Sequence, residues 1–119
     1  MVATPLPSGR FVPDRGDICW LDFNPQAGHE QAGRRPALVI TPRAYNVKTG
    51  LLIACPITNH SKAYPFEVAL PGGWAVTGVI LSDHVKSFDW KARRAVFACR
   101  VSNDIVADVL AKLTALVAP

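Results

Sequence analysis

The sequence predicts a mainly β fold with an α+β arrangement: a small barrel of about seven short strands followed by a C-terminal helix. Short apolar runs alternate with turn signals along most of the chain, and near the C-terminus the apolar spacing becomes helical. The chain has 119 residues, of which 50% are hydrophobic and 18% are charged. This composition excludes a disordered chain and provides enough apolar side chains for one domain.

The expected strands are the apolar runs themselves. They cover residues 18–23, 37–41, 51–57, 66–70, 76–81, 84–87 and 95–101. Asn24-Pro25, Thr49-Gly50 and Pro71-Gly72-Gly73 separate several of these runs, and each can reverse the chain direction. We therefore expect mostly sequential, antiparallel strand pairing.

The C-terminal helix is predicted from apolar residues at helical spacing. They are Ile105, Val106, Val109, Leu110, Leu113, Leu116 and Val117. Ser102 or Asn103 can serve as the N-cap, and Asp104 carries a favourable charge for the first turn. Residues 43–47 are also compatible with a short helical turn. Residues 1–14 contain three prolines and are expected to form a flexible N-terminal arm before a single domain at 15–119.

The cysteines and the charge limit the class of protein. Cys19, Cys55 and Cys99 are odd in number and widely spaced within apolar runs, which predicts buried, reduced thiols instead of disulfides or a zinc site. No apolar run is long enough to span a bilayer, and the N-terminus lacks the apolar core of a signal peptide, so we expect a cytoplasmic protein without membrane contact. The net charge of +4 weakly favours a polyanionic partner.

The segment Gly28 to Pro36 is the most informative part of the chain. It contains a carboxylate, an amide and two guanidiniums, from Glu30, Gln31 and the pair Arg34-Arg35, between two expected strands. Arginine side chains held this way are suited to bind an anion such as phosphate. A surface ion pair between Glu30 and Arg35 is the simpler alternative for these two residues alone.

Several motifs occur together and in order across residues 15–117. They are Arg15-Gly16-Asp17, the run from Trp20 to Pro25, the loop from Glu30 to Ala37, Tyr45-Asn46, Pro56-Ile57-Thr58, the run from Ser61 to Val68, and the run from Gly78 to Ser87. In this combination the chain resembles the MazF/PemK family of toxin endoribonucleases, the mRNA interferases of type II toxin-antitoxin systems. The resemblance covers nearly the whole expected domain.

This resemblance implies an SH3-like barrel of the CcdB/PemK type and a homodimer. It also implies sequence-specific cleavage of single-stranded RNA, including mRNA, without a metal or other cofactor, and growth arrest as the outcome. A MazE-like antitoxin would bind over the RNA groove. The family pattern assigns the catalytic pair to Arg35 and Thr58 and adds Glu30 from the same loop.

The chemistry of these residues fits that reaction, with one gap. Without a metal, the ribose 2′-OH attacks the phosphate and leaves a 2′,3′-cyclic phosphate and a 5′-OH. Arg35 can hold two phosphate oxygens and Thr58 can donate a hydrogen bond to the same group. A guanidinium with a pKa above ~12 is a poor base, so Glu30 is the first candidate to accept the 2′-OH proton, with His29 and His60 as alternatives.

Further residues are predicted to contact RNA. Phe23 is a candidate to stack on a base, and the polar or basic candidates are His29, Gln31, Asn46, Lys62, His84 and Lys86. His84 stands where many relatives have Gln, and an imidazole offers a different pattern of hydrogen-bond donors and acceptors at this position; the sequence leaves its effect on the cleavage motif open. The tryptophans Trp20, Trp74 and Trp90 are expected to be core or interface anchors.

Two non-enzymatic alternatives share the expected fold. A gyrase-poisoning toxin would bind a protein target and would not need the pair of Arg35 and Thr58. A peptide-binding SH3-like adaptor would have an aromatic-lined groove, whereas the groove expected here is basic and polar.

Overall fold

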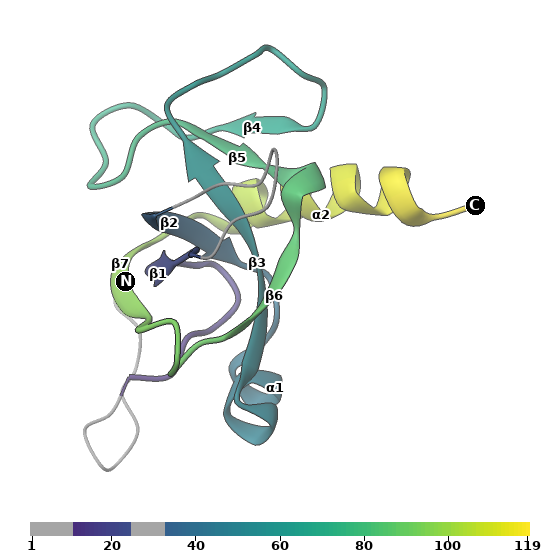
Figure 1. Cartoon of the computed structure of the whole chain (residues 1–119). Coiled ribbons are helices and arrows are strands. Elements are labelled where there is room, and N and C mark those ends of the chain that lie inside the picture. Colours follow the sequence, from purple (N-terminus) through teal and green to yellow (C-terminus); the bar gives the residue numbers. More distant parts are fainter. Residues whose placement is uncertain (1–10, 25–32) are drawn as a thin grey trace.

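A seven-stranded antiparallel sheet is the framework of the protein in the computed structural model, which describes residues 11–24 and 33–119 (Figure 1). The strands are β1 (Asp17–Asp22), β2 (Arg34–Val39), β3 (Leu51–Thr58), β4 (Glu67–Ala69), β5 (Val79–Leu81), β6 (Lys86–Asp89) and β7 (Val96–Arg100). The helices are α1 (Arg43–Thr49), the short 3-10 helix η1 (Ser82–His84) and α2 (Asn103–Val117). The predicted mainly β fold with a C-terminal helix is confirmed.

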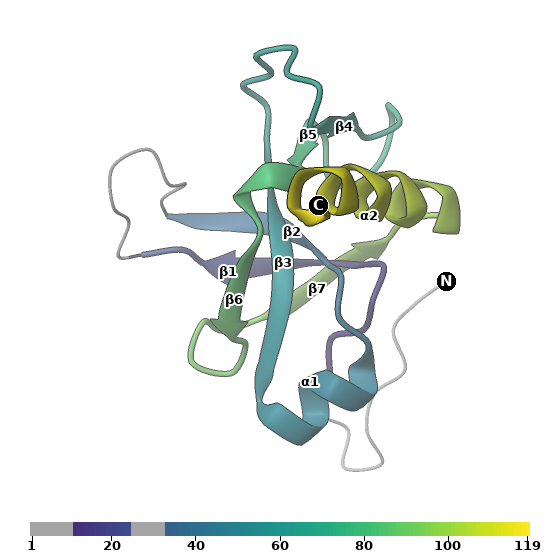
Figure 2. The same cartoon turned by 90° about the vertical axis from the view of Figure 1, so that its right-hand side faces the viewer.

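The strand β3 organises the sheet. The strand order is β4-β5-β3-β2-β1-β7, and β6 also pairs with β3. Ile57 and Thr58, at the end of β3, pair with β5, whereas residues 51–54 pair with β6. All of these pairs are antiparallel, as expected, but the pairings of β3 with β5 and β6 and of β1 with β7 are not between sequential strands. Figure 2 shows β3 crossing the whole molecule.

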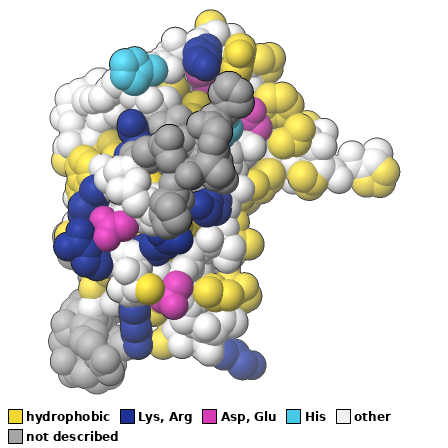
Figure 3. Space-filling view, in the orientation of Figure 1, with side chains coloured by type: hydrophobic (Ala, Val, Ile, Leu, Met, Phe, Trp, Pro, Cys, Tyr) yellow, Lys and Arg dark blue, Asp and Glu magenta, His cyan; other side chains and the backbone are white. Residues whose placement is uncertain are grey.

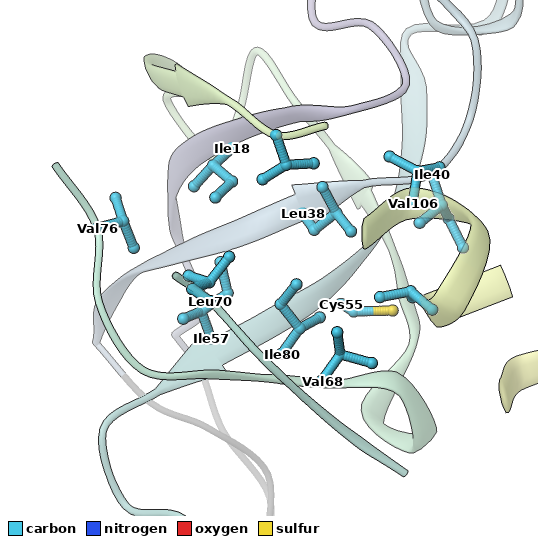
Figure 4. Close-up of a cluster of buried hydrophobic side chains, with 12 residues drawn as sticks. Ile18, Leu38, Ile40, Cys55, Ile57, Val68, Leu70, Val76, Ile80 and Val106 are labelled. Atoms are coloured by element: carbon cyan, nitrogen blue, oxygen red, sulfur yellow. The ribbon is translucent and has the colours of Figure 1, made fainter. Parts of the chain in front are cut away.

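Two buried clusters form on the opposite faces of β1, β2 and β3. Successive residues of a strand point to opposite faces, so Ile18 and Leu38 belong to a first core, while Cys19 and Ala37 belong to a second. The first core lies between these strands, β4, β5 and α2, and Figure 4 shows Ile18, Leu38, Ile80 and Val106 converging there. The second core includes Val12, Phe23, Leu52, Phe88 and Trp90.

The N-terminal boundary of the domain differs from the prediction. Val12 is fully buried in the second core, with Phe11 packed against that core. The Asp14 carboxylate accepts the backbone N–H of Arg43 at 2.8 Å, which fixes the start of α1. Residues 11–14 therefore belong to the domain and not to an arm, because their apolar side chains pack in the second core and the Asp14 carboxylate is hydrogen-bonded to α1.

Local chemistry accounts for the start of α2 and for the end of α1. The Ser102 hydroxyl accepts the backbone N–H of Ile105 at 3.4 Å, so Ser102 is the N-cap of α2, and Val106 and Val109 are buried. The helix α1 runs two residues further than expected and ends at Gly50, whose φ of 74° lies in the left-handed region. No helix among the described residues is long and apolar enough to cross a membrane.

The three cysteines are free thiols, as predicted. Cys19 and Cys55 are buried, and Cys99 is half-buried. Burial raises the pKa of the Cys55 thiol to about 12. It also raises the pKa of the other two thiols, so these side chains pack as neutral apolar groups.

Candidate active site

The antiparallel pairing of β2 with β3 brings Arg35 and Thr58 to opposite positions on neighbouring strands. Ala37 pairs with Pro56 in this antiparallel ladder. Continuing the same register by two residues places Arg35 opposite Thr58, on one face of the sheet. Both residues line a pocket of about 270 Å³, which also includes Trp20, Asn59 and Thr77. We call it the Trp20 pocket.

Thr58 also lines a second, adjacent pocket. This pocket has a volume of about 420 Å³, and we call it the His84 pocket. Its other lining residues are His60, Lys62, Tyr64, Glu67, Leu81, Asp83 and His84. The structure thus brings together Thr58, the candidate base His60 and the candidate RNA contacts Lys62 and His84.

The Thr58 hydroxyl is held in place by one hydrogen bond and by burial. The side chain is buried with 5% of its surface exposed, and its oxygen accepts the backbone N–H of His60 at 3.1 Å. Among the described residues no acceptor is found for the hydroxyl hydrogen, so Thr58 can donate it to a bound group. This is the chemistry expected of a residue that contacts a phosphate oxygen.

Both ends of the loop between β1 and β2 are fixed by the turn between β6 and β7. The Asp22 carboxylate accepts from Arg34 Nη1 at 3.0 Å and from Arg94 Nε at 2.7 Å. These two guanidiniums lower the pKa of Asp22 to about 2. Asn24 and Gly33 close the base of the loop through a 3.1 Å hydrogen bond between the Gly33 N–H and the Asn24 side chain. The predicted contacts His29, Glu30 and Gln31 lie outside the described residues.

The wall of the His84 pocket from Ser61 to Tyr64 is organised by Glu67. The Glu67 carboxylate accepts from the Ser61 hydroxyl at 2.6 Å and from the Lys62 N–H at 2.9 Å. These hydrogen bonds, that from Ser61 first, lower the pKa of Glu67. Ala63 has a φ of 57°, a left-handed conformation that costs free energy in a non-glycine residue. Glu67 therefore holds a turn that would otherwise be disfavoured.

Lys86 of β6 pairs with β3 but lines neither of the two pockets. It pairs with Ala54 of β3, and its ammonium nitrogen lies 5.5 Å from the centre of the Phe88 ring. Because Ala54 pairs with Val39, Lys86 lies on the same face of the sheet as Arg35. Figure 3 shows Lys and Arg side chains gathered on the face seen in that view, which is favourable for a polyanion.

Two of the predicted RNA contacts are wrong. Phe23 is 3% exposed, and its ring packs edge-to-face against Phe88 with a centroid distance of 4.9 Å, so it cannot stack on a base. Asn46 is fully buried, and its amide donates to the carbonyl oxygens of Pro13 and Thr41 at 2.8 and 3.0 Å. Both side chains are used by the fold, which leaves neither available to a ligand.

The tryptophans divide between core and surface. Trp90 is buried and donates from its indole nitrogen to the Asn46 carbonyl at 2.9 Å, and Trp74 packs against the first core, as expected for anchors. Trp20, in contrast, is 37% exposed and lines the pocket that contains Arg35. The sequence prediction missed this residue as a site residue, since a tryptophan in an apolar strand gives no sign of exposure. No cluster of metal-ligating side chains is found among the residues described.

A sequence model of the PemK-like, MazF-like toxins of type II toxin-antitoxin systems matches residues 14–117. The chain belongs to this family. It is 47% identical to the endoribonuclease toxin MazF of Escherichia coli (strain K12), over 91% of this chain and 96% of that protein. The family assignment agrees with the resemblance found from the sequence motifs.

Solved structures agree with this PemK/MazF-family fold. The crystal structure of MazF (Form-I) from Deinococcus radiodurans matches with a TM-score of 0.88 and 53% identity, over 92% of this chain and 99% of that chain. The MazE-MazF complex (Form-II) from the same organism matches with a TM-score of 0.81 and 47% identity, over 91% of this chain and 97% of that one. The barrel with its C-terminal helix is therefore the family fold.

Proposed function

We propose that this PemK/MazF-family protein is a sequence-specific endoribonuclease toxin that cleaves single-stranded RNA, including mRNA, and thereby arrests growth. The observation that supports this most directly is the convergence of Arg35 and Thr58 on one pocket, which Arg34 also lines. A relative of 47% identity is named an endoribonuclease toxin, which supports the same reaction.

The two residues would act on the phosphate. The RNA 2′-OH loses its proton and attacks the adjacent phosphorus, the P–O5′ bond breaks, and the departing 5′-oxygen takes up a proton from a general acid or from water. The products are a 2′,3′-cyclic phosphate and a 5′-OH end. Arg35 stabilises the negative charge that builds up on the phosphate oxygens, and Thr58 donates its free hydroxyl hydrogen to the same group. DNA lacks the 2′-OH and is not cleaved by this route.

A further group must accept the proton of the 2′-OH. Glu30 is our first candidate, and His29 is an alternative, although both lie outside the described residues. His60 is the candidate within the described part of the chain, because it lines the His84 pocket and its backbone N–H binds Thr58. A dependence of kcat on a group titrating near pH 6–7 would indicate a histidine, and an unaltered kcat in Glu30→Gln would exclude Glu30 as the base.

The partners proposed for this chain are RNA, a MazE-like antitoxin that covers the RNA groove, and a second copy of the chain. The solved complex of MazE with MazF from Deinococcus radiodurans supports the antitoxin. Leu116 and Val117 on α2 are 46% and 69% exposed, which is consistent with a homodimer contact. We propose a cytoplasmic location, where mRNA is available.

The direct test is digestion of a mixed RNA pool by the purified protein in EDTA, followed by sequencing of the 5′-OH ends. We expect cleavage at a short motif. Arg35→Ala and Thr58→Val should each lower kcat by about 10²- to 10³-fold, the loss typical of a removed charge-stabilising donor. Thr114→Val, at an exposed position of α2, is the matched control for the loss of a threonine hydroxyl.

Intact RNA under these conditions would overturn the proposal and favour a non-enzymatic, gyrase-poisoning toxin of the same fold. Cleavage at the wild-type rate in Arg35→Ala or Thr58→Val would leave the proposed nuclease activity intact but would show that the substituted residue is not catalytic. Co-purification of a nuclease contaminant is excluded when the control Thr114→Val cleaves and both site variants do not.

A further inference from the structure

Two exposed aromatic side chains lie on either side of Thr58. Trp20 lines the Trp20 pocket and is 37% exposed, and Tyr64 lines the His84 pocket and is 55% exposed. Thr58 is the last residue of β3 and lines both pockets. The two pockets are therefore neighbours that meet at the proposed position of the scissile phosphate.

Trp20 is placed by its partners in the sheet. It pairs with Pro36 of β2 on one side and with Val96 of β7 on the other. Arg34 and Arg35 line the same pocket, so the indole lies beside positive charge. A rigid aromatic surface next to guanidiniums is the combination that binds a nucleotide, because the ring can contact the base and the cations can contact its phosphates.

Tyr64 is held by the turn that Glu67 organises. The Tyr64 carbonyl accepts the backbone N–H of Glu67 at 3.1 Å, while the Glu67 carboxylate fixes Ser61 and Lys62. The ring is thus exposed on a backbone that is fixed before any ligand binds. Lys62 and His84 line the same pocket and can contact the phosphates or the base edges of the bound nucleotide.

We propose that Trp20 and Tyr64 are base-stacking platforms for the two nucleotides that flank the scissile phosphate. This inference rests on the proposed function and adds to it two binding residues and the division of the groove into two subsites. The His84 pocket, at about 420 Å³, lies within the size range of small-ligand sites, and the Trp20 pocket, at about 270 Å³, lies just below it. Every base has a flat aromatic face, so stacking supplies affinity at both subsites while hydrogen bonds supply sequence preference.

The test separates contacts to bases from contacts to the backbone and does not depend on cleavage. One probe is a mixed-sequence pool of 2′-O-methyl RNA decamers, which cannot react because the nucleophile is blocked. The other is an abasic decamer with the same 2′-O-methyl backbone and the same charge. Binding of both probes is measured for the full-length protein and for Trp20→Leu and Tyr64→Leu, with thermal unfolding as a check on the fold.

We expect each leucine variant to bind the base-bearing pool about tenfold more weakly than the wild type, in keeping with one lost stacking contact. Binding of the abasic decamer should stay unchanged, and Trp20→Phe and Tyr64→Phe should retain most of the affinity. Val96→Ala and Tyr45→Leu are matched controls, because both side chains are exposed, Val96 adjoins Trp20, and neither lines a pocket described here.

Wild-type affinity for the base-bearing pool in both leucine variants would overturn the inference. An equal loss of affinity for both probes would also overturn it, since that result indicates a general change in the groove. The outcome is distinct from that of the nuclease test. If the wild type cleaves RNA and the leucine variants bind it normally, the proposed function stands and only the stacking inference fails. If the wild type neither cleaves nor binds RNA, the proposed function and the stacking inference both fail.

Discussion

Gly78 packs so closely against the backbone of Thr58 that no side chain fits between them. A Cβ atom on Gly78 would lie 2.3 Å from the Thr58 carbonyl oxygen and 2.8 Å from its carbonyl carbon. The φ of Gly78 is +118°, which L side chains rarely adopt. Gly78 immediately precedes β5, so the approach of β5 to β3 sets the position of the proposed catalytic threonine.

Gly78→Ala should therefore lower cleavage by displacing Thr58. We expect kcat to fall at least ~10-fold, together with a loss of about 1–3 kcal/mol in the free energy of unfolding from overpacking. Cleavage assays and urea denaturation measure the two effects. Gly72→Ala is the matched control, because a Cβ there meets nothing within 4 Å, and a wild-type kcat in Gly78→Ala would contradict the structural role.

Asn46→Ala should destabilise the fold without changing the affinity for RNA. Its side chain joins Pro13 to Thr41, and removal leaves buried polar groups without partners. We expect a loss of about 2–4 kcal/mol in the free energy of unfolding, from several unsatisfied groups. The KM for RNA, measured well below the melting temperature, should equal that of the wild type. A raised KM with unaltered stability would instead support a direct RNA contact.

Asp22→Asn should weaken the contacts that hold together the two ends of the loop between β1 and β2. This loop contains Glu30, the first candidate for the general base. The substitution keeps the size of the side chain but removes the charge that binds Arg34 and Arg94. The paired arginines lower the pKa of Asp22 from 3.8 to about 2, so the carboxylate stabilises the fold above pH 3.8 and loses that contribution as the pH falls through about 2.

We therefore expect Asp22→Asn to be less stable than the wild type at pH 7 and equal to it below about pH 2. At pH 7 its kcat should also fall severalfold. Urea denaturation at the two pH values and a cleavage assay measure these effects. A stability difference of the same size at both pH values would show that the charge of Asp22 is not responsible.

Arg100→Met should strongly destabilise the domain, because Asp17 has no exposed surface and its carboxylate accepts from Arg100 Nη1 at 2.8 Å. Leaving a buried carboxylate without its cation typically costs about 3–5 kcal/mol. The partly exposed pair of Lys112 and Asp108, at 3.8 Å, provides the control: Lys112→Met should change stability by less than about 0.5 kcal/mol.

The pH dependence of this variant follows from burial, which raises the pKa of Asp17. A carboxyl group with a raised folded pKa stabilises the fold most when it is protonated, and that contribution is lost as the pH rises through the folded pKa. Removal of Arg100 raises the pKa further, so the deficit in stability should be larger at pH 8 than at pH 5. Urea denaturation at both values tests this, and a deficit that grows toward low pH would contradict it.

Local patterns in the sequence predicted most elements of this fold. Apolar runs between turn signals predicted the strands, although β5 begins three residues later than the strand expected at 76–81, and the strand expected at 84–87 is replaced by the end of η1 and by β6 at 86–89. Helical spacing behind Ser102 predicted α2 with its N-cap. The prediction failed where burial depended on contacts between distant segments. Asn46 looked like a polar surface residue, but it is buried because Pro13 and Trp90 pack around α1.

Local periodicity and short motifs along the chain were enough to predict the order of the strands, the terminal helix, the family and the proposed catalytic residues. Long-range contacts established that Arg35 and Thr58 share a pocket, that Phe23 is buried, and that Trp20 and Tyr64 are exposed beside Thr58. No local pattern encodes these facts, because exposure depends on strand register and on the sharing of β3 between β2, β5 and β6. These pairings join residues that are far apart in sequence.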